Sequence, residues 1–182
     1  MMASSATISD LGAVQDKGKA ELINRQLVAL PPSGFLPGRA GGEIYASLRA
    51  YERSTRSGYA IPDNVGFVVR LPNRNSFSPD AAFYTGRVTG MKFLEGAPVF
   101  AAEVRSENDY GDQAEQAMAA KRTDYFAAGT LVVWDVDLLH DDVIRVYRTD
   151  QPDQPTIYRR GDLAEAAPAV PGWTLAVDDL FT

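Results

Sequence analysis

The chain has 182 residues, of which 45% are hydrophobic, and a net charge of −6; this fits one domain with a single sizeable core and argues against a dedicated nucleic-acid coat protein. It has no cysteine and one histidine, His140, which excludes disulfides, thiolate sites and histidine-rich zinc sites, and any serine–histidine–aspartate triad would have to use His140. The sequence has no apolar run of about 18 residues, the length that would predict a membrane span. The first ten residues lack the regions of a signal peptide, so we expect a cytoplasmic protein.

The N-terminal half begins with a segment that lacks hydrophobic periodicity. We therefore expect a mobile lead-in over residues 1–17, with a short helical turn near 11–15, and one domain over residues 18–182. Two apolar runs around a polar centre predict a hairpin over 20–30. Proline and glycine at 31–34 and 37–38 predict a break, after which an apolar stripe predicts a helix from Gly42 to a cap at Gly58. Strands are expected at 65–71 and 77–84.

The C-terminal half is organised around residues 98–106, an apolar run that ends in a carboxylate, Glu103, and predicts a largely buried strand. Residues 113–128 predict a helix, and Lys121 falls in the middle of its apolar face, so it requires an explanation. Later strands are expected at 131–136, 142–147 and 156–158, with a turn over 150–155. This order predicts an α/β domain in which helices flank a central mixed β-sheet, with an N-terminal hairpin.

Charge is unevenly distributed along the chain. Residues 39–92 carry eight basic and four acidic side chains, whereas residues 93–182 carry seven basic and seventeen acidic ones. A basic face for a polyanion could therefore come only from the first half, where Arg49, Arg53 and Arg56 are candidates to contact phosphates. An ordinary solvated surface explains the same arginines equally well.

Two acids, Asp80 and Glu103, each lie at the end of an apolar strand, and their spacing of 23 residues suits adjacent strands joined by a loop. Carboxylates side by side repel each other unless a divalent cation lies between them. Oxygen ligands without histidine or thiolate favour Mg²⁺ or Mn²⁺. Lys121 could bring its ammonium over the same point and orient or help deprotonate a water. The chemistry best served is displacement at phosphorus.

Other interpretations of the same residues, without metal binding, stay open. Lys121 could lay its stem on the core and reach solvent, and Asp80 could cap a turn after Ser78-Pro79. A glycosidase pair of Asp80 and Glu103 is another alternative, but it leaves Lys121 without a purpose. We expect His140 to be a solvated turn residue.

Several motifs together resemble one known family. They are Ser78-Pro79-Asp80, the strand with Glu103, Lys121-x-x-x-Tyr125 and Trp134-x-Val136-Asp137. This combination is similar to the Uma branch of the PD-(D/E)XK restriction-endonuclease-like superfamily. The segments 21–28 and 171–181 resemble the ends of the same family, so the resemblance covers residues 19–181.

The resemblance implies a metal-dependent endonuclease that hydrolyses phosphodiester bonds of DNA, with Asp80 and Glu103 as ligands of Mg²⁺ or Mn²⁺. In the superfamily's commonest layout a lysine follows the glutamate by two residues, and that place holds Arg105 here. In the Uma branch the next helix supplies the lysine, which corresponds to Lys121. Glu21 matches an acidic position near the family's start, so Glu21 and Arg105 are possible auxiliary residues.

The resemblance also makes a homodimer a reasonable expectation. The chain departs from the family pattern at Asn24-Arg25, where a turn glycine is common, and it has no histidine near Gly41. The acidic second half motivates an alternative function: a catalytically silent interaction or dimerisation module on the same fold.

Overall fold

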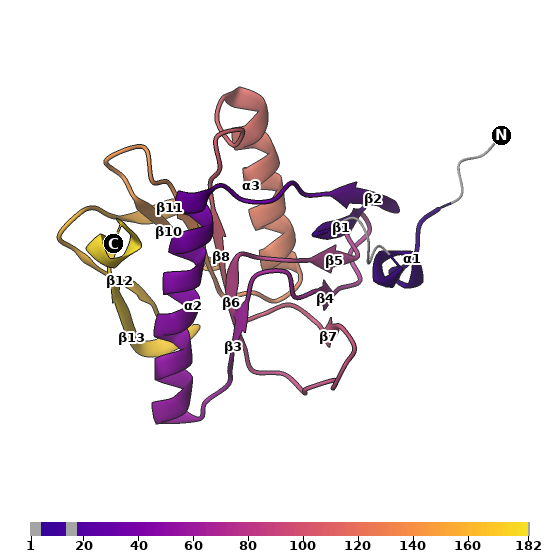
Figure 1. Cartoon of the computed structure of the whole chain (residues 1–182), viewed down its shortest axis with the longest axis horizontal. Helices are drawn as coiled ribbons and strands as arrows, with labels where there is room; N and C mark the ends of the chain where they lie inside the picture. The colour runs from indigo at the N-terminus through magenta and orange to yellow at the C-terminus, as the bar shows by residue number, and fades with distance from the viewer. Residues whose placement is uncertain (1–4, 14–17, 182) are drawn as a thin grey trace.

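A central sheet of six strands organises the computed structural model, which describes residues 5–13 and 18–181 (Figure 1). The strand order is β11-β10-β9-β8-β6-β3. Strands β8 and β9 run parallel and every other neighbouring pair runs antiparallel. The bounds are β3 (Tyr59–Pro62), β6 (Ala81–Tyr84), β8 (Phe100–Val104), β9 (Val132–Val136), β10 (Ile144–Arg148) and β11 (Gln151–Tyr158). The predicted mixed sheet is confirmed.

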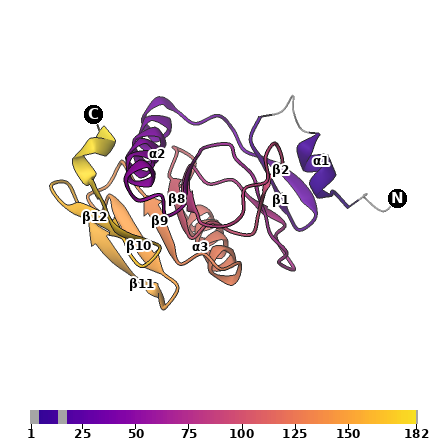
Figure 2. The same ribbon diagram turned by 90° about the horizontal axis from the view of Figure 1, so that it is seen from below.

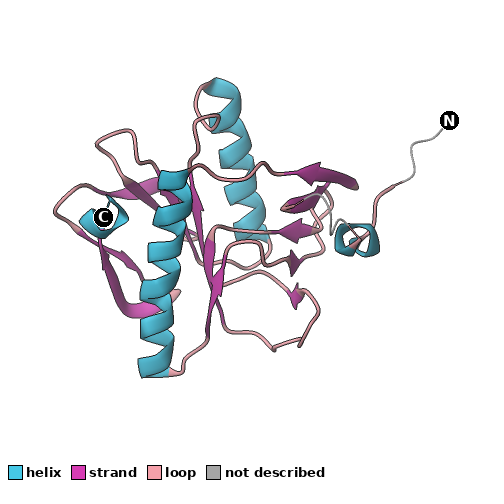
Figure 3. Cartoon of the chain, viewed as in Figure 1, coloured by secondary structure: helices cyan, strands magenta, loops and turns pink. Residues whose placement is uncertain are grey.

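The two long helices, α2 (Phe35–Thr55) and α3 (Asp112–Ala127), cover opposite faces of this sheet (Figures 2 and 3). Helix α2 buries Ile44 and Leu48 against one face, where alternate residues of β8, such as Phe100, point. Helix α3 buries Tyr125 against the other face, beside Ala101. Helices on both faces explain why β8 and β9 read as continuous apolar runs.

Smaller elements complete the two layers. The α2 side also holds β12 (Leu163–Ala166), β13 (Val170–Ala176) and the 3-10 helix η1 (Val177–Phe181). The α3 side holds a small sheet of β4 (Phe67–Val68), β5 (Ser76–Phe77) and β7 (Leu94–Glu95). Among the described residues, no helix is long and apolar enough to span a membrane.

The predicted N-terminal hairpin is confirmed as β1 (Ala20–Ile23) and β2 (Gln26–Ala29). Its turn residues, Asn24 and Arg25, have φ values of 48° and 59°, the left-handed conformations that a two-residue turn between twisted strands requires. The turn therefore forms without glycine. Backbone and side-chain hydrogen bonds between Leu22 and residues 75–76 anchor the hairpin to the domain.

The lead-in contains a helix, α1 (Ile8–Gly12), which starts earlier than the predicted turn at 11–15. Its Leu11 is buried, and the N–H of Ala6 donates to the carbonyl of Arg25 at 2.8 Å. Residues 1–4 and 14–17 of the predicted mobile segment, and residue 182, lie outside the described residues. The boundary at residue 18 stays a prediction.

Several sequence expectations were wrong. The strand expected over 77–84 is divided between β5 and β6, which belong to different sheets, and the strand expected over 65–71 is limited to β4. Helix α2 starts at Phe35, because Pro37 occupies its first turn, where a backbone N–H has no intrahelical partner to lose; it ends with Arg56 in the left-handed cap position in place of Gly58. The expected turn over 150–155 lies largely within β11 instead. Because β11 is an edge strand, its prolines do not interrupt a ladder on both sides.

Candidate active site

Asp80 and Glu103 lie on neighbouring strands, as their spacing predicts. Asp80 immediately precedes β6, and Glu103 is the fourth residue of β8, whose Ala102 pairs with Ala81. The N–H of Asp80 donates to the carbonyl of Ala102 at 3.1 Å, and the N–H of Val104 donates to Asp80 Oδ2 at 2.8 Å. These bonds hold the Asp80 carboxylate at the end of β8, next to Glu103.

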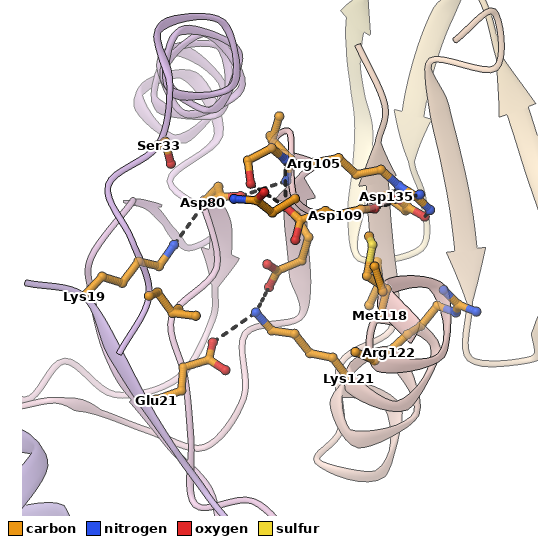
Figure 4. Close-up of a pocket in the computed structure, with 18 of the residues that line it drawn as sticks. Lys19, Glu21, Ser33, Asp80, Arg105, Asp109, Met118, Lys121, Arg122 and Asp135 are labelled. Carbon is orange, nitrogen blue, oxygen red and sulfur yellow. Dashed lines mark hydrogen bonds and ion pairs between the residues drawn. The ribbon is translucent and has the colours of Figure 1, made fainter. Parts of the chain in front are cut away.

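Lys121 reaches the same place from α3. Its Nζ lies 2.8 Å from Glu103 Oε1 and 3.0 Å from Glu21 Oε1, and its side chain is 19% exposed (Figure 4). Burial by itself would lower the pKa of Lys121, but the carboxylates of Glu103 and Glu21 raise it above its ordinary value. The ion pairs explain a lysine on an apolar helix face, and they keep it protonated.

Glu103 also accepts a hydrogen bond from the hydroxyl of Tyr125, at 2.6 Å, on the oxygen that Lys121 contacts. Tyr125 follows Lys121 by one helical turn and stacks on Phe77 with ring centroids 4.0 Å apart. The pKa of Glu103 is raised, first by burial and further by the negative charges of Asp80 and Glu21, against the opposing effect of Lys121. Glu103 therefore lies in a buried cluster in which three carboxylates are paired with Lys19, Arg74 and Lys121.

Glu21 is buried, with 2% of its side chain exposed, and both of its oxygens are held. Oε1 accepts from the N–H of Ser78 at 2.9 Å in addition to Lys121, and Oε2 accepts from Arg74 at 2.6 Å. Burial tends to raise the pKa of Glu21, but Lys121 and Arg74 lower it overall. In this arrangement Glu21 positions Lys121, and its oxygens are occupied by protein groups.

Lys19 belongs to the site, although sequence reasoning missed it. Its Nζ lies 2.8 Å from Asp80 Oδ1 and 2.7 Å from Asp63 Oδ1 (Figure 4). Lys19 precedes Glu21 by two residues, the spacing that puts two side chains on one side of a strand. That spacing was the signal available in the sequence, but it was overlooked because Lys19 lies next to the predicted lead-in.

Arg105, the residue in the commonest lysine slot, is engaged elsewhere. Its guanidinium binds Asp135 through two hydrogen bonds of 2.7 Å and also contacts Glu115. These carboxylates raise the pKa of Arg105. The structure therefore brings together Asp80, Glu103, Lys121 and Glu21 and turns the Arg105 side chain toward β9 and the start of α3.

Two further sets of sequence candidates lie apart from this site. Arg49, Arg53 and Arg56 line a separate hollow with Tyr59, at the end of the sheet where Tyr59 pairs with the last residue of β6. Asp80 precedes the first residue of that strand, roughly 13 Å away along four residues. His140 is largely exposed, and its Nδ1 lies 2.9 Å from Asp137 Oδ2 in the turn after β9.

Whether the carboxylate pair suits a divalent cation depends on the donor atoms that it offers. Among the described residues, no group of three or more histidine, cysteine, aspartate or glutamate side chains is placed to hold a metal ion. Asp80 and Glu103 supply oxygen donors, and the contacts that described residues make with the Glu103 carboxylate fall on Oε1. Two carboxylates suit Mg²⁺, which keeps several waters and binds through one or two carboxylates and substrate phosphates. The oxygen donors of the pair are of the kind that such an ion prefers, and Lys19 and the N–H of Val104 already contact the two oxygens of Asp80.

The mixed sheet lies between two helices and brings two carboxylates and a lysine together. The chain belongs to the Uma2 family, whose model, described as "Putative restriction endonuclease", matches residues 8–178. The fold is similar to a crystal structure described as a "putative nuclease belonging to DUF820" from Anabaena variabilis ATCC 29413. That similarity has a TM-score of 0.70 and 17% identity and covers 89% of each chain. Among curated proteins no relative matches.

Proposed function

We propose that this protein is a divalent-metal-dependent endonuclease that hydrolyses phosphodiester bonds, with DNA as substrate. The observation that carries this proposal is the convergence of Lys121 with two carboxylates: its Nζ lies 2.8 Å from Glu103, which neighbours Asp80 across β6 and β8. Membership of a family described as "Putative restriction endonuclease" supports the same chemistry.

In this proposal Asp80 and Glu103 hold Mg²⁺ or Mn²⁺. When bound, such an ion supplies positive charge that polarises a phosphoryl oxygen and lowers the pKa of water. Lys121 orients the attacking water and balances charge that develops on the phosphate. Because the pKa of Lys121 is raised, its ammonium donates hydrogen bonds and does not accept the proton of the water. Glu21 and Tyr125 hold Lys121 and Glu103 in place.

The test is cleavage of supercoiled plasmid with Mg²⁺ or Mn²⁺. We expect the wild-type protein to nick or linearise the plasmid, and we expect Asp80→Asn and Lys121→Met each to lose at least about 100-fold in rate. Asp153→Asn and Lys92→Met are matched controls, since both residues are exposed and lie outside the cleft. Cleavage that survives Asp80→Asn or Lys121→Met would contradict the assignment.

An alternative function is a catalytically silent interaction or dimerisation module. Ion pairs within the chain already compensate the charges of Lys19, Glu21 and Lys121, and this internal balance favours the alternative. Titration calorimetry distinguishes the two functions, because the silent module predicts no binding of Mg²⁺ or Mn²⁺ at millimolar concentration. The homodimer and the cytoplasmic location stay predictions from sequence, and sedimentation velocity measures the first.

A further inference from the structure

The carboxylate pair lies in a cleft of about 400 Å³, a size typical of small-ligand sites. One side of the cleft is formed by the N-terminal hairpin and the segment after it, and the other by α3 (Figure 4). The cleft therefore has two walls that come from distant parts of the sequence, with Asp80 and Glu103 between them.

The α3 wall is apolar. Ala114, Ala117 and Met118 share the helix face of Lys121 and Tyr125, but they line the cleft, with Ala117 exposed and the other two partly buried. The apolar stripe thus serves two purposes: Tyr125 lies in the core, and the first two turns of the helix border an open space. Apolar side chains thus lie next to the charged groups of the cleft.

The opposite wall also carries apolar residues, next to polar ones. Ile23 at the end of β1, Leu30 after β2, and Pro31 line it, and none of the three is fully buried. Two apolar surfaces that face each other across a cleft can take up a flat, apolar ligand face from both sides. Polar groups line the same cleft: Lys19 and Glu21 come from the hairpin side, and Lys121 comes from α3 (Figure 4).

The charge of the cleft is balanced. Five basic and five acidic side chains line it: Lys19, Arg74, Arg105, Lys121 and Arg122, and Glu21, Asp80, Glu103, Asp109 and Asp135. Four of these cations are ion-paired with carboxylates. In the part of the chain that the structure describes, Arg122 is the cleft cation without a carboxylate partner, and its guanidinium lies 3.6 Å from the centre of the Tyr147 ring.

Duplex DNA is bound chiefly through phosphates, and its binding surfaces are strongly positive and extended. This cleft has neither property, and the arginines at 49, 53 and 56 lie at the other end of the sheet. A base within a duplex presents only its edges, since both of its faces are stacked. An unpaired base presents two apolar faces, and contact with those faces tolerates any sequence.

We propose that the cleft binds an unpaired nucleotide, so that the substrate is a single-stranded segment of nucleic acid. The inference rests on the proposed function, which places the phosphodiester at Asp80 and Glu103. The base adjoining that bond packs between Met118 on one wall and Ile23 and Pro31 on the other. Arg122 also lines the cleft, with its guanidinium over the Tyr147 ring.

The experiment measures binding by fluorescence anisotropy, at low salt, with Ca²⁺ present and Mg²⁺ and Mn²⁺ absent. The probes are a labelled strand of about 20 nucleotides without self-complementarity and the same strand annealed to its complement. We expect the single strand to bind at least about tenfold more tightly than the duplex. Equal or tighter binding of the duplex would overturn the proposal.

Ala117→Glu tests whether binding uses the α3 wall, and Ala120→Glu is its matched control. Both residues are exposed on α3 and both changes add one negative charge, but only Ala117 lines the cleft. Glutamate is a good helix former, so both variants are expected to fold. Single-strand affinity should fall at least about fivefold in Ala117→Glu and change less than about twofold in Ala120→Glu. Equal effects of the two changes would overturn the proposal.

The outcome separates this inference from the proposed function. Wild-type cleavage that Asp80→Asn abolishes, together with preferred binding of the duplex, leaves the nuclease intact and refutes the unpaired substrate. Single-strand binding that depends on Ala117, without cleavage by the wild-type protein, supports the cleft and refutes the nuclease.

Discussion

Tyr125 and Lys121 converge on one oxygen: the Tyr125 hydroxyl lies 2.6 Å and the Lys121 ammonium 2.8 Å from Glu103 Oε1. The two residues are one turn apart on α3, so a single helix face supplies both donors. Two donors on one oxygen restrict the orientation of the Glu103 carboxylate.

Tyr125→Phe removes the hydroxyl and keeps the ring that stacks on Phe77. We expect the free energy of unfolding to fall by about 1–3 kcal/mol, because a buried hydrogen bond to a charged group is lost. Urea denaturation measures the change. Tyr125→Leu should cost more, since it also removes the aromatic stack; a Tyr125→Phe variant as stable as wild type would show that the hydroxyl contributes little.

Glu21→Gln leaves Arg74 and Lys121 with fewer counter-charges in a buried place. We expect a loss of about 3–5 kcal/mol in unfolding free energy, the usual result of breaking a buried pair from one side. Asp142→Asn, which breaks the exposed pair with Arg159, should cost less than about 1 kcal/mol. Similar losses for the two variants would be inconsistent with a structural role of the Glu21 network.

Lys19→Met removes a positive charge from Asp80 Oδ1. If Asp80 and Glu103 hold a divalent cation, we expect Mn²⁺ to bind roughly tenfold more tightly, because a nearby like charge no longer opposes it. Titration calorimetry measures the dissociation constant. Lys92→Met, an exposed lysine on a loop, serves as control and should leave it unchanged. Weaker Mn²⁺ binding by Lys19→Met would show that Lys19 assists the ion.

Arg105→Lys replaces a guanidinium that binds Asp135 with two parallel hydrogen bonds. A lysine does not reproduce this geometry, so we expect a loss of about 2 kcal/mol in unfolding free energy. Plasmid cleavage, assayed well below the melting temperature, should stay within about threefold of wild type, because Arg105 contributes to stability and not to the chemistry. Cleavage lost as completely as in Lys121→Met would place Arg105 in the active site.

Much of the fold is predictable from the sequence where a local pattern carries the information. The two apolar runs around the polar turn of the hairpin and the apolar runs of β8 and β9 gave the right elements, because buried strands are marked by local runs of apolar residues. The start of α2 was missed, since Pro37 reads as a break until the first turn is known to tolerate it. The extent of β11 was missed because its prolines suit only an edge strand.

The sequence by itself determined the candidate residues Asp80, Glu103 and Lys121, since a charge in an apolar run is anomalous without reference to any structure. Only the tertiary structure decided what surrounds them: Lys19 lies against Asp80, 61 residues away in sequence, and Glu21 and Arg105 have protein partners of their own. The tertiary structure also places half of the apolar face of α3 along an open cleft. The physical reason is that the periodic spacing of apolar residues indicates which side chains are buried. Ion pairs and clefts depend instead on which distant segments the folded chain brings into contact.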